Sequence, residues 1–395
     1  MIEHRMRLSL LVFAVASLAC DEARPDRLPF DDEGWTVSAR PTVTIGGSDE
    51  REGYLLQQVV GATRLSDGRI VIADVGSSDL LFYDSAGAHL KTVGGAGEGP
   101  GELRRIMQLL RLPGDTLLVL SFRPGLTWFS SEGELVRSER VSWPEVFSLP
   151  CRVAETNWLA LPDGSLLTVL EDNLGSAPCP PPPDPPWRST GLVARSTALD
   201  GSFDTLGVFP ATEWSFPDYR AFGRSLVLGF GDDRIFVGDT GAEEIPALDL
   251  QGDTLSAYPT PWEAVPIPPE AKRERLRRFV RSDGTVETGD PYLYPERYPR
   301  FGRLLADEVG YLWVMAYPEL LEPIPAPMLA LTSASALVVE EGGARWRVLD
   351  PSGRIVTEVR TPRGLFPLEI GEGHVLGVSK NEYDVHAVQL HTLVR

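Results

Sequence analysis

The residues with the most potential for chemistry lie in a glycine-rich stretch, TVGGAGEGPGEL, at residues 92–103, which holds five glycines and two glutamates. Such a loop binds phosphate when a lysine accompanies its backbone amides, as in GxxxxGK[ST]. This stretch has no lysine, and the third glycine of a dinucleotide-binding GxGxxG spacing, counted from Gly95, falls on Pro100. The carboxylates of Glu98 and Glu102 would also repel an anion, so the stretch is not a phosphate loop.

Other catalytic motifs are missing from the sequence. It contains no GxSxG nucleophile turn, no HExxH and no cysteine–histidine spacing typical of zinc. His386 and His391 share one expected strand at an odd spacing, so they point to opposite faces and cannot share a metal ion. The sequence therefore predicts no catalytic residue.

The glycine run is better explained as part of a repeat. TIGGSDEREGYL, at residues 44–55, matches this run at its first residue, a threonine, and at its last residue, a leucine. It also matches at three glycines and at one glutamate. Farther along the chain, RLSDGRIVI, at residues 64–72, aligns with RLPGDTLLV, at residues 111–119, when the alignment is shifted by one residue. The repeat period is therefore about 47 residues. The glycine run is therefore a connecting loop that recurs between repeated units.

Each repeated unit has the pattern of short β-strands. Apolar runs such as RIVIAD, TLLVLS and YLWVMA last four to six residues, which favours strands over helices. Most are followed by a second strand that ends in apolar–Asp/Ser–x–x–Gly, a hairpin tip that requires glycine at positive φ. Six such units can be counted along the chain.

The fold predicted from these units is all-β. Strands that are apolar throughout must be covered on both faces, and six radially stacked sheets achieve this in a six-bladed β-propeller. The sixth unit lacks an outer strand, whereas PTVTIGG, at residues 41–47, matches the outer-strand pattern without a unit of its own. We therefore expect residues 41–47 to close the ring as the outermost strand of the last blade.

These residues resemble a known group of proteins. DGRIVIADVGSSDLLFYDSAGAHLKTVG, at residues 67–94, is similar to an NHL repeat. GEGPGEL, YLWV and LGVSKNEYDVHAVQLHTL resemble segments of exported bacterial six-bladed β-propellers of the NHL-repeat-like and TolB-like superfamily. The resemblance covers residues 41–395. It implies the fold and carries no catalytic residue that can be transferred.

The N-terminus resembles an export signal. Basic residues precede an apolar run that ends at Cys20 and is too short to span a bilayer, so residues 1–20 are predicted to be a signal peptide. SLAC resembles a bacterial lipobox, which predicts a lipoprotein acylated at Cys20; an ordinary cleaved signal is the alternative. Residues 21–40 are polar and acidic and predict a flexible tether. Either alternative places residues 41–395 outside the cytoplasm, in the cell envelope or secreted.

Two further cysteines, Cys151 and Cys179, form an even pair in an oxidising compartment. We expect a disulfide between them, with two unpaired buried thiols as the alternative. The net charge of −19 should repel nucleic acid and anionic lipid, so membrane association is expected through a lipid anchor only. We expect a monomer.

Long loops are predicted to gather on one face of the propeller. Connections between successive blades share this face with the loops between second and third strands, and they are rich in aromatic residues. Glu98 and Glu102, near the mouth of the channel, and the aromatic residues Trp214, Tyr219 and Trp262 are predicted to bind an envelope protein, a peptide or a glycan. The alternative is that these aromatic side chains pack the loops against the propeller.

The insertion at residues 263–300 contains PPEAKRERLRRFVR, which predicts a basic helix. One interpretation is a lid whose Arg275 and Arg278 meet an anionic ligand over the central channel. The other is a docked helix whose arginines offset neighbouring acidic loops.

The predicted function is non-catalytic binding through the long-loop face, without a cofactor. Gluconolactonase-like propellers, which the fold resembles, bind a divalent metal through Glu, Asn and Asp. Glu98, Glu102 and Asp384 offer oxygen ligands of the kind that calcium prefers, although no pair of motifs matches that family. The alternative function is therefore a calcium-dependent lactonase- or lyase-like hydrolase, and a third is an envelope assembly subunit without a small ligand.

Overall fold

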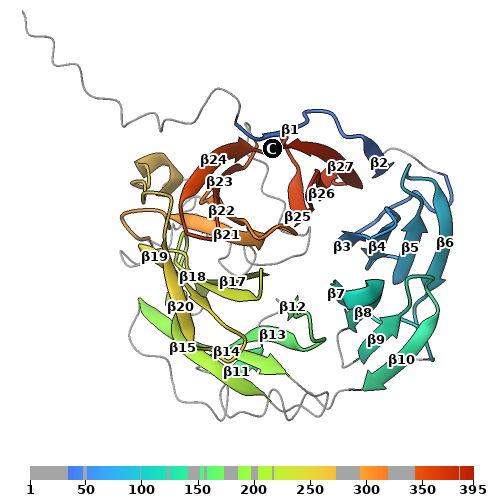
Figure 1. The fold of residues 1–395 in the computed structure, drawn as a ribbon, viewed down its shortest axis with the longest axis horizontal. Coiled ribbons are helices and arrows are strands. Elements are labelled where there is room, and N and C mark those ends of the chain that lie inside the picture. The colour runs from blue at the N-terminus through green and yellow to red at the C-terminus, as the bar shows by residue number, and fades with distance from the viewer. Residues whose placement is uncertain are drawn as a thin grey trace, which may run out of the picture. The chain divides into compact units, whose positions relative to one another are not determined.

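Six antiparallel sheets lie in a ring in the computed structural model, and they form a single unit at residues 34–395 (Figure 1). The chain is thus a six-bladed β-propeller, as the sequence predicts. Within the described residues, no helix has both the length and the apolar character needed to cross a membrane. The structure describes residues 34–47, 51–97, 99–121, 125–140, 152–154, 158–172, 186–196, 203–215, 218–272, 294–318, 343–381 and 383–395.

Four blades have four strands each, paired in sequence order from the centre of the ring outward. Blade 1 consists of β3 (Val59–Arg64), β4 (Ile70–Asp74), β5 (Asp79–Tyr83) and β6 (His89–Gly94). Blade 2 consists of β7 (Ile106–Leu112), β8 (Thr116–Ser121), β9 (Gly125–Phe129) and β10 (Leu135–Arg140). Blade 4 consists of β17 (Leu226–Gly231), β18 (Arg234–Asp239), β19 (Glu244–Leu248) and β20 (Thr254–Pro259). Blade 5 consists of β21 (Phe301–Ala306), β22 (Leu312–Ala316), β23 (Arg345–Leu349) and β24 (Ile355–Arg360).

Blades 3 and 6 depart from this plan. In blade 3 the innermost position is divided between two short strands that both pair with β13. Its strands are β11 (Arg152–Ala154), β12 (Leu159–Ala160), β13 (Leu166–Asp172), β14 (Trp187–Ser196), β15 (Asp204–Ser215) and β16 (Asp218–Tyr219). Blade 6 consists of β25 (Phe366–Ile370), β26 (His374–Lys380) and β27 (His386–Val394), completed by β1 (Thr36–Val37) and β2 (Val43–Gly46).

One buried apolar cluster lies at each junction between successive blades. The cluster between blades 1 and 2, for example, joins Val71 and Phe82 to Val119 and Phe129. The other five clusters likewise combine residues from two neighbouring blades, including the one between blade 6 and blade 1. Each blade is thus covered on both faces by its neighbours. This explains strands such as β4, in which every residue is buried.

The hairpin tips follow the pattern read from the sequence. In the outer hairpin of blade 1, the Gly87 amide donates to the Asp84 carbonyl at 3.0 Å, and the Asp84 carboxylate accepts from the Ala88 amide at 2.8 Å. Gly87 has φ 85°, a left-handed conformation that glycine adopts without steric penalty. Three other outer hairpins repeat this arrangement with glycines at positive φ, namely Gly133, Gly252 and Gly353.

The ring is closed by the strand predicted to close it. β2 pairs with β27 in antiparallel register, with Ile45 opposite Val388. Ile45 is fully buried in the cluster between blades 6 and 1. The first and last parts of the ring are therefore joined by main-chain hydrogen bonds and by an apolar core.

The predicted tether is too long at its C-terminal end, because the propeller begins at Gly34 and not at residue 41. β1 pairs with the end of β27, and the ring of Trp35 lies 4.9 Å from that of Tyr311 in an edge-to-face contact. The Arg395 guanidinium lies 4.5 Å from the centre of the Trp35 ring. The polar composition of residues 21–40 concealed this one half-buried aromatic anchor.

The closure predicts a specific stability loss. Ile45→Ala should lower the free energy of unfolding by about 3 kcal/mol, because it leaves a cavity in a fully buried cluster. Thr44→Ala, on the exposed side of the same strand, should change it by less than about 0.5 kcal/mol. Urea unfolding of the two variants checks this, and equal effects would contradict the role assigned to β2.

Candidate functional site

The long-loop face is the face that carries the connections between successive blades and the loops between second and third strands. Its described parts are residues 51–58, 75–78, 95–97, 99–105, 220–225, 240–243, 260–272, 294–300, 317–318, 343–344, 361–365, 381 and 383–385. Several of the residues predicted to form a site lie outside the described residues, namely Cys20, Glu98, Cys151, Cys179, Arg275, Arg278 and the side chain of Tyr219. The predicted disulfide and the predicted lid stay predictions.

Trp262 packs into the ring and is only 6% exposed. Its Nε1 donates to the Val314 carbonyl at 2.9 Å, and the guanidinium of Arg347 lies 4.2 Å from its ring centre. Trp262 therefore holds the connection between blades 4 and 5 onto blade 5. For this residue the structure favours the packing alternative.

Trp214, at the end of β15, is stacked on Trp187 of β14, with ring centres 5.6 Å apart and planes inclined by 6°. Trp187 is buried and Trp214 is half-buried. Trp187 and Trp214 are cross-strand partners in the antiparallel pair of β14 and β15, so their side chains lie next to each other on one face of the sheet. Stacking of this kind stabilises the outer part of blade 3 near the long-loop face.

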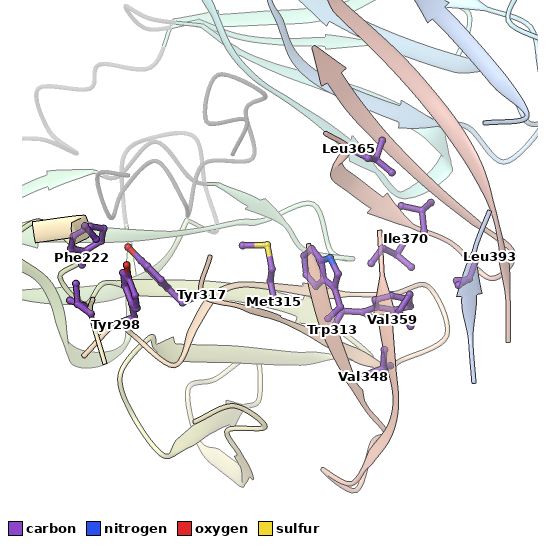
Figure 2. Packing of buried hydrophobic residues seen from close by; sticks show 14 of the residues in the cluster. Phe222, Tyr298, Trp313, Met315, Tyr317, Val348, Val359, Leu365, Ile370 and Leu393 are labelled. Carbon is purple, nitrogen blue, oxygen red and sulfur yellow. The ribbon is translucent and has the colours of Figure 1, made fainter. Parts of the chain in front are cut away.

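A second aromatic group lies on the long-loop face between blades 4, 5 and 6. The Tyr298 ring lies 5.6 Å from the Tyr317 ring in a stacked contact and 5.0 Å from the Phe222 ring in an edge-to-face contact. Figure 2 shows these rings in a row that continues to Met315 and Trp313. All three rings are buried, and burial raises the pKa of Tyr317 above its usual range. They fix the base of the loops from which they come.

Phe222 adopts φ 56°, a conformation that bulky residues rarely adopt. Its ring is almost completely buried beside Ile267 and Ala271. The backbone strain, about 1–3 kcal/mol, is offset by this burial. Ala271 belongs to the short described start of the predicted helix, at residues 269–272, so that this end of the insertion is docked.

Tyr383 is the described aromatic residue on this face whose ring is exposed, at 77%. Its loop is ordered by Asn381, whose Oδ1 accepts from the amides of Tyr383 and Val385 at 2.9 and 3.0 Å. Tyr383 is not among the residues predicted from the sequence. The signal for it was Asn381, because asparagine caps tight turns in this way.

Acidic side chains near the strand ends that border the long-loop face accept hydrogen bonds from other groups of the protein. The Asp74 carboxylate accepts from the amides of Gln57, Gln58 and Gly76 at 2.7, 2.9 and 2.8 Å. It is completely buried and joins the end of β4 to the connection that precedes β3. Asp74 therefore has a structural role at the junction with the closing strand.

Three further carboxylates are engaged in the same way. Asp239 of blade 4 accepts two hydrogen bonds from Arg188 of blade 3, at 2.7 and 2.8 Å. Glu171 of blade 3 is buried and accepts from the hydroxyls of Ser189 and Thr212 at 2.6 and 2.8 Å, and Glu213 binds Arg224 at 2.6 Å. These contacts tie strands and blades together.

Of the three residues predicted as metal ligands, the structure describes Glu102 and Asp384. The Glu102 carboxylate accepts from the Gly99 amide of its own loop at 2.7 Å, and Asp384 lies 3.8 Å from Lys380 in the last blade. Among the described residues, no three His, Cys, Asp or Glu side chains are close enough to hold a metal ion. Glu98 is outside the part of the chain that the structure describes.

Comparison with other sequences finds one partial relative. No protein-family model matches the chain. It is 31% identical over 166 residues to nucleoredoxin of Bos taurus, which covers 40% of this chain. The matched part spans only 34% of nucleoredoxin.

Solved structures that align with this chain include several bacterial proteins. A member of the DUF4221 family from Bacteroides vulgatus aligns with a TM-score of 0.53 at 13% identity, covering 91% of this chain and 98% of that one. A Bacteroides fragilis protein proposed to be exported gives a TM-score of 0.49 at 13% identity, covering 92% and 96%. The calcium-binding protein regucalcin from Agrobacterium tumefaciens gives 0.43 at 13% identity, covering 90% and 95%. At this identity the first likeness shows the fold alone, and the other two are too distant to support an argument.

The role assigned to Trp262 can be tested by stability. Trp262→Ala should lower the free energy of unfolding by about 3–5 kcal/mol, because a buried ring and its hydrogen bond are lost. Tyr383→Ala on the same face should change it by less than about 0.5 kcal/mol, because that ring is exposed. Chemical unfolding distinguishes the two; an unaffected Trp262→Ala variant would return Trp262 to the candidate binding residues.

Proposed function

We propose that the chain is a non-catalytic binding protein of the bacterial cell envelope that recognises a protein, peptide or glycan through its long-loop face. Tyr383 is the observation that carries this proposal. Its ring is 77% exposed on a turn fixed by Asn381. Rigid, exposed aromatic side chains contribute large contact areas at a low cost in conformational entropy, which is why they dominate binding surfaces.

The anchored bases of the loops support the same function. Trp262, Tyr298 and Phe222 attach the connections around blades 4 and 5 to the ring by buried contacts. A surface held in place before binding loses less entropy when the partner arrives. Leu55 and Val265 add exposed apolar area on this face, at 57% and 39% exposure.

The carboxylates of this face support binding over hydrolysis. Asp74, Asp239, Glu171 and Glu213 accept hydrogen bonds from the protein's own amides, hydroxyls and arginines. A carboxylate committed in this way stabilises the fold and is not poised to activate water. Calcium dependence through Glu98, Glu102 and Asp384 stays a prediction for metal analysis of the purified protein.

Export and lipid attachment complete the proposal. Residues 1–20 have the basic start, apolar run and terminal cysteine of a bacterial lipoprotein signal. The ring begins at Gly34, which leaves residues 21–33 as the tether between the acylated Cys20 and the propeller. In this arrangement the lipid anchor is the only contact with the membrane.

The partner surface can be tested by site-specific photocrosslinking in the producing bacterium. A photoreactive phenylalanine at position 383 should give one dominant adduct, and the same group at Val309, which is 43% exposed in a turn on the opposite face, should not. Mass spectrometry identifies the adduct. Crosslinks at 309 alone, or the same adducts at both positions, would place the partner elsewhere.

Lipid attachment can be tested on the full chain in bacterial cells. The unaltered protein should be found with the membranes and incorporate labelled fatty acid, whereas Cys20→Ser should incorporate none. Cys151→Ser is the matched control and should remain membrane-bound and labelled. A membrane-bound, unlabelled parent protein would overturn the lipid anchor and leave the binding proposal standing.

A further inference from the structure

Arginines gather around the centre of the long-loop face. Each innermost strand starts at this face, so the three residues before it lie at the inner edge of the ring. In blades 1, 2, 4, 5 and 6 these are residues 56–58, 103–105, 223–225, 298–300 and 363–365. They include no carboxylate, and they include the arginines Arg104, Arg105, Arg224, Arg300 and Arg363. The chain as a whole has 56 acidic and 37 basic residues, so the inner edge departs from the average charge of the protein.

The opposite face has the reverse charge at its centre. Arg111 of blade 2 lies 3.6 Å from Glu308 of blade 5. These two blades face each other across the ring, so side chains span its centre at the opposite face. A ligand that binds at the centre of the ring is therefore expected at the long-loop face. The three residues after the innermost strand include a carboxylate in every blade, namely Asp67, Asp115, Asp163, Asp232, Asp307 and Glu372.

Four arginines of the inner edge are accessible to a ligand. Arg104, Arg105 and Arg363 are exposed, and the side chain of Arg224 is 46% exposed. Arg300 is different, because its side chain is 16% exposed and paired with two glutamates. We therefore define the arginine rim as Arg104, Arg105, Arg224 and Arg363. These residues come from blades 2, 4 and 6, which alternate around the ring, so a ligand that contacts all of them must carry several anionic groups.

Neighbouring carboxylates leave the arginine rim available. Glu213 lies 2.6 Å from Arg224 and also 3.3 Å from Arg220, so its charge is shared between two guanidinium groups. Arg363 forms no ion pair with a described carboxylate. An exposed guanidinium of this kind can exchange water for a ligand carboxylate without the cost of breaking a buried contact.

The backbone of Arg105 is strained. Its φ is 47°, in the left-handed region that side chains other than those of glycine, asparagine and aspartate rarely adopt. Strain of this kind persists where the surrounding structure holds a residue in place, and it is common at ligand-binding positions. The conformation of Arg105 is thus consistent with a binding role for the arginine rim.

We propose that the arginine rim binds an acidic segment of the partner protein. This inference rests on the proposed function and names the kind of partner that the long-loop face takes. The planar guanidinium donates two parallel hydrogen bonds to a carboxylate, which makes arginine well suited to this contact. Opposite charges also speed the encounter and orient the partner on the face.

Apolar surface beside the arginine rim favours a peptide over an acidic glycan. Leu55 is 57% exposed and directly precedes residues 56–58 of the inner edge. Tyr383 is 77% exposed on blade 6, which also supplies Arg363. A peptide can place apolar side chains between its carboxylates, whereas a chain of uronic acids is polar throughout.

The experiment is a fluorescence anisotropy titration of labelled hexaglutamate with the full chain at low ionic strength. We expect saturable binding that weakens as sodium chloride is added, because salt screens exposed charges. Arg363→Gln should weaken binding about fivefold, which is the upper value for one exposed ion pair. Arg354→Gln is the matched control, because this side chain is 81% exposed at a hairpin tip of the opposite face; it should keep the affinity within about twofold.

Absent binding to the unaltered protein, or equal losses in Arg363→Gln and Arg354→Gln, would overturn the proposal. An oligogalacturonate of equal charge is the glycan arm of the experiment, and tighter binding of it than of hexaglutamate contradicts a peptide occupant. If Arg363→Gln does not fold, Arg104→Gln replaces it, and the same fivefold loss is expected.

Photocrosslinking at position 383 separates this inference from the proposed function. A crosslinked partner whose yield falls about fivefold in Arg363→Gln supports both. An adduct that Arg363→Gln leaves unchanged keeps the proposed function and contradicts the acidic segment. If position 383 gives no adduct while hexaglutamate still binds through Arg363, the proposed function fails and the arginine rim stands as a site for acidic peptides.

Discussion

The structure depends on the fact that each blade is apolar on both faces. A sheet of this kind cannot stand at the edge of an assembly, because one of its faces would meet water. Six buried clusters, each shared by two successive blades, solve this only if the last blade also packs on the first. Closure of the ring therefore buries the cluster between blades 6 and 1, and β1 and β2 supply it by pairing with β27.

The architecture was predictable from the sequence because it is repeated. The Asp/Ser–x–x–Gly hairpin tips, the strand runs and the unassigned segment at residues 41–47 each point to a local structure that recurs in the ring. Trp35 and the divided inner strand of blade 3 escaped prediction because each occurs once and lies among polar or proline-rich neighbours. A pattern that occurs once has no second copy to confirm it.

The candidate site was less predictable, for a physical reason. Whether an aromatic side chain packs or binds depends on what lies above it, and sequence does not give this. Trp262 and Tyr383 are both aromatic residues in loops of one face, yet the first is 6% exposed and the second 77%.

The pairing of β1 and β2 with β27 has a consequence for biogenesis. The Ser38 hydroxyl and the Thr392 amide that it accepts from are 354 residues apart in sequence. A ribosome makes the N-terminal partner first and the C-terminal partner last, so the intervening blades emerge before the ring can be sealed. During this interval the side of blade 1 that finally meets blade 6 is open to solvent and to other nascent chains. A truncated copy that lacks β27 would leave β1 and β2 without their partner strand and the cluster between blades 6 and 1 incomplete, so it should open more readily and be cleaved more easily by proteases.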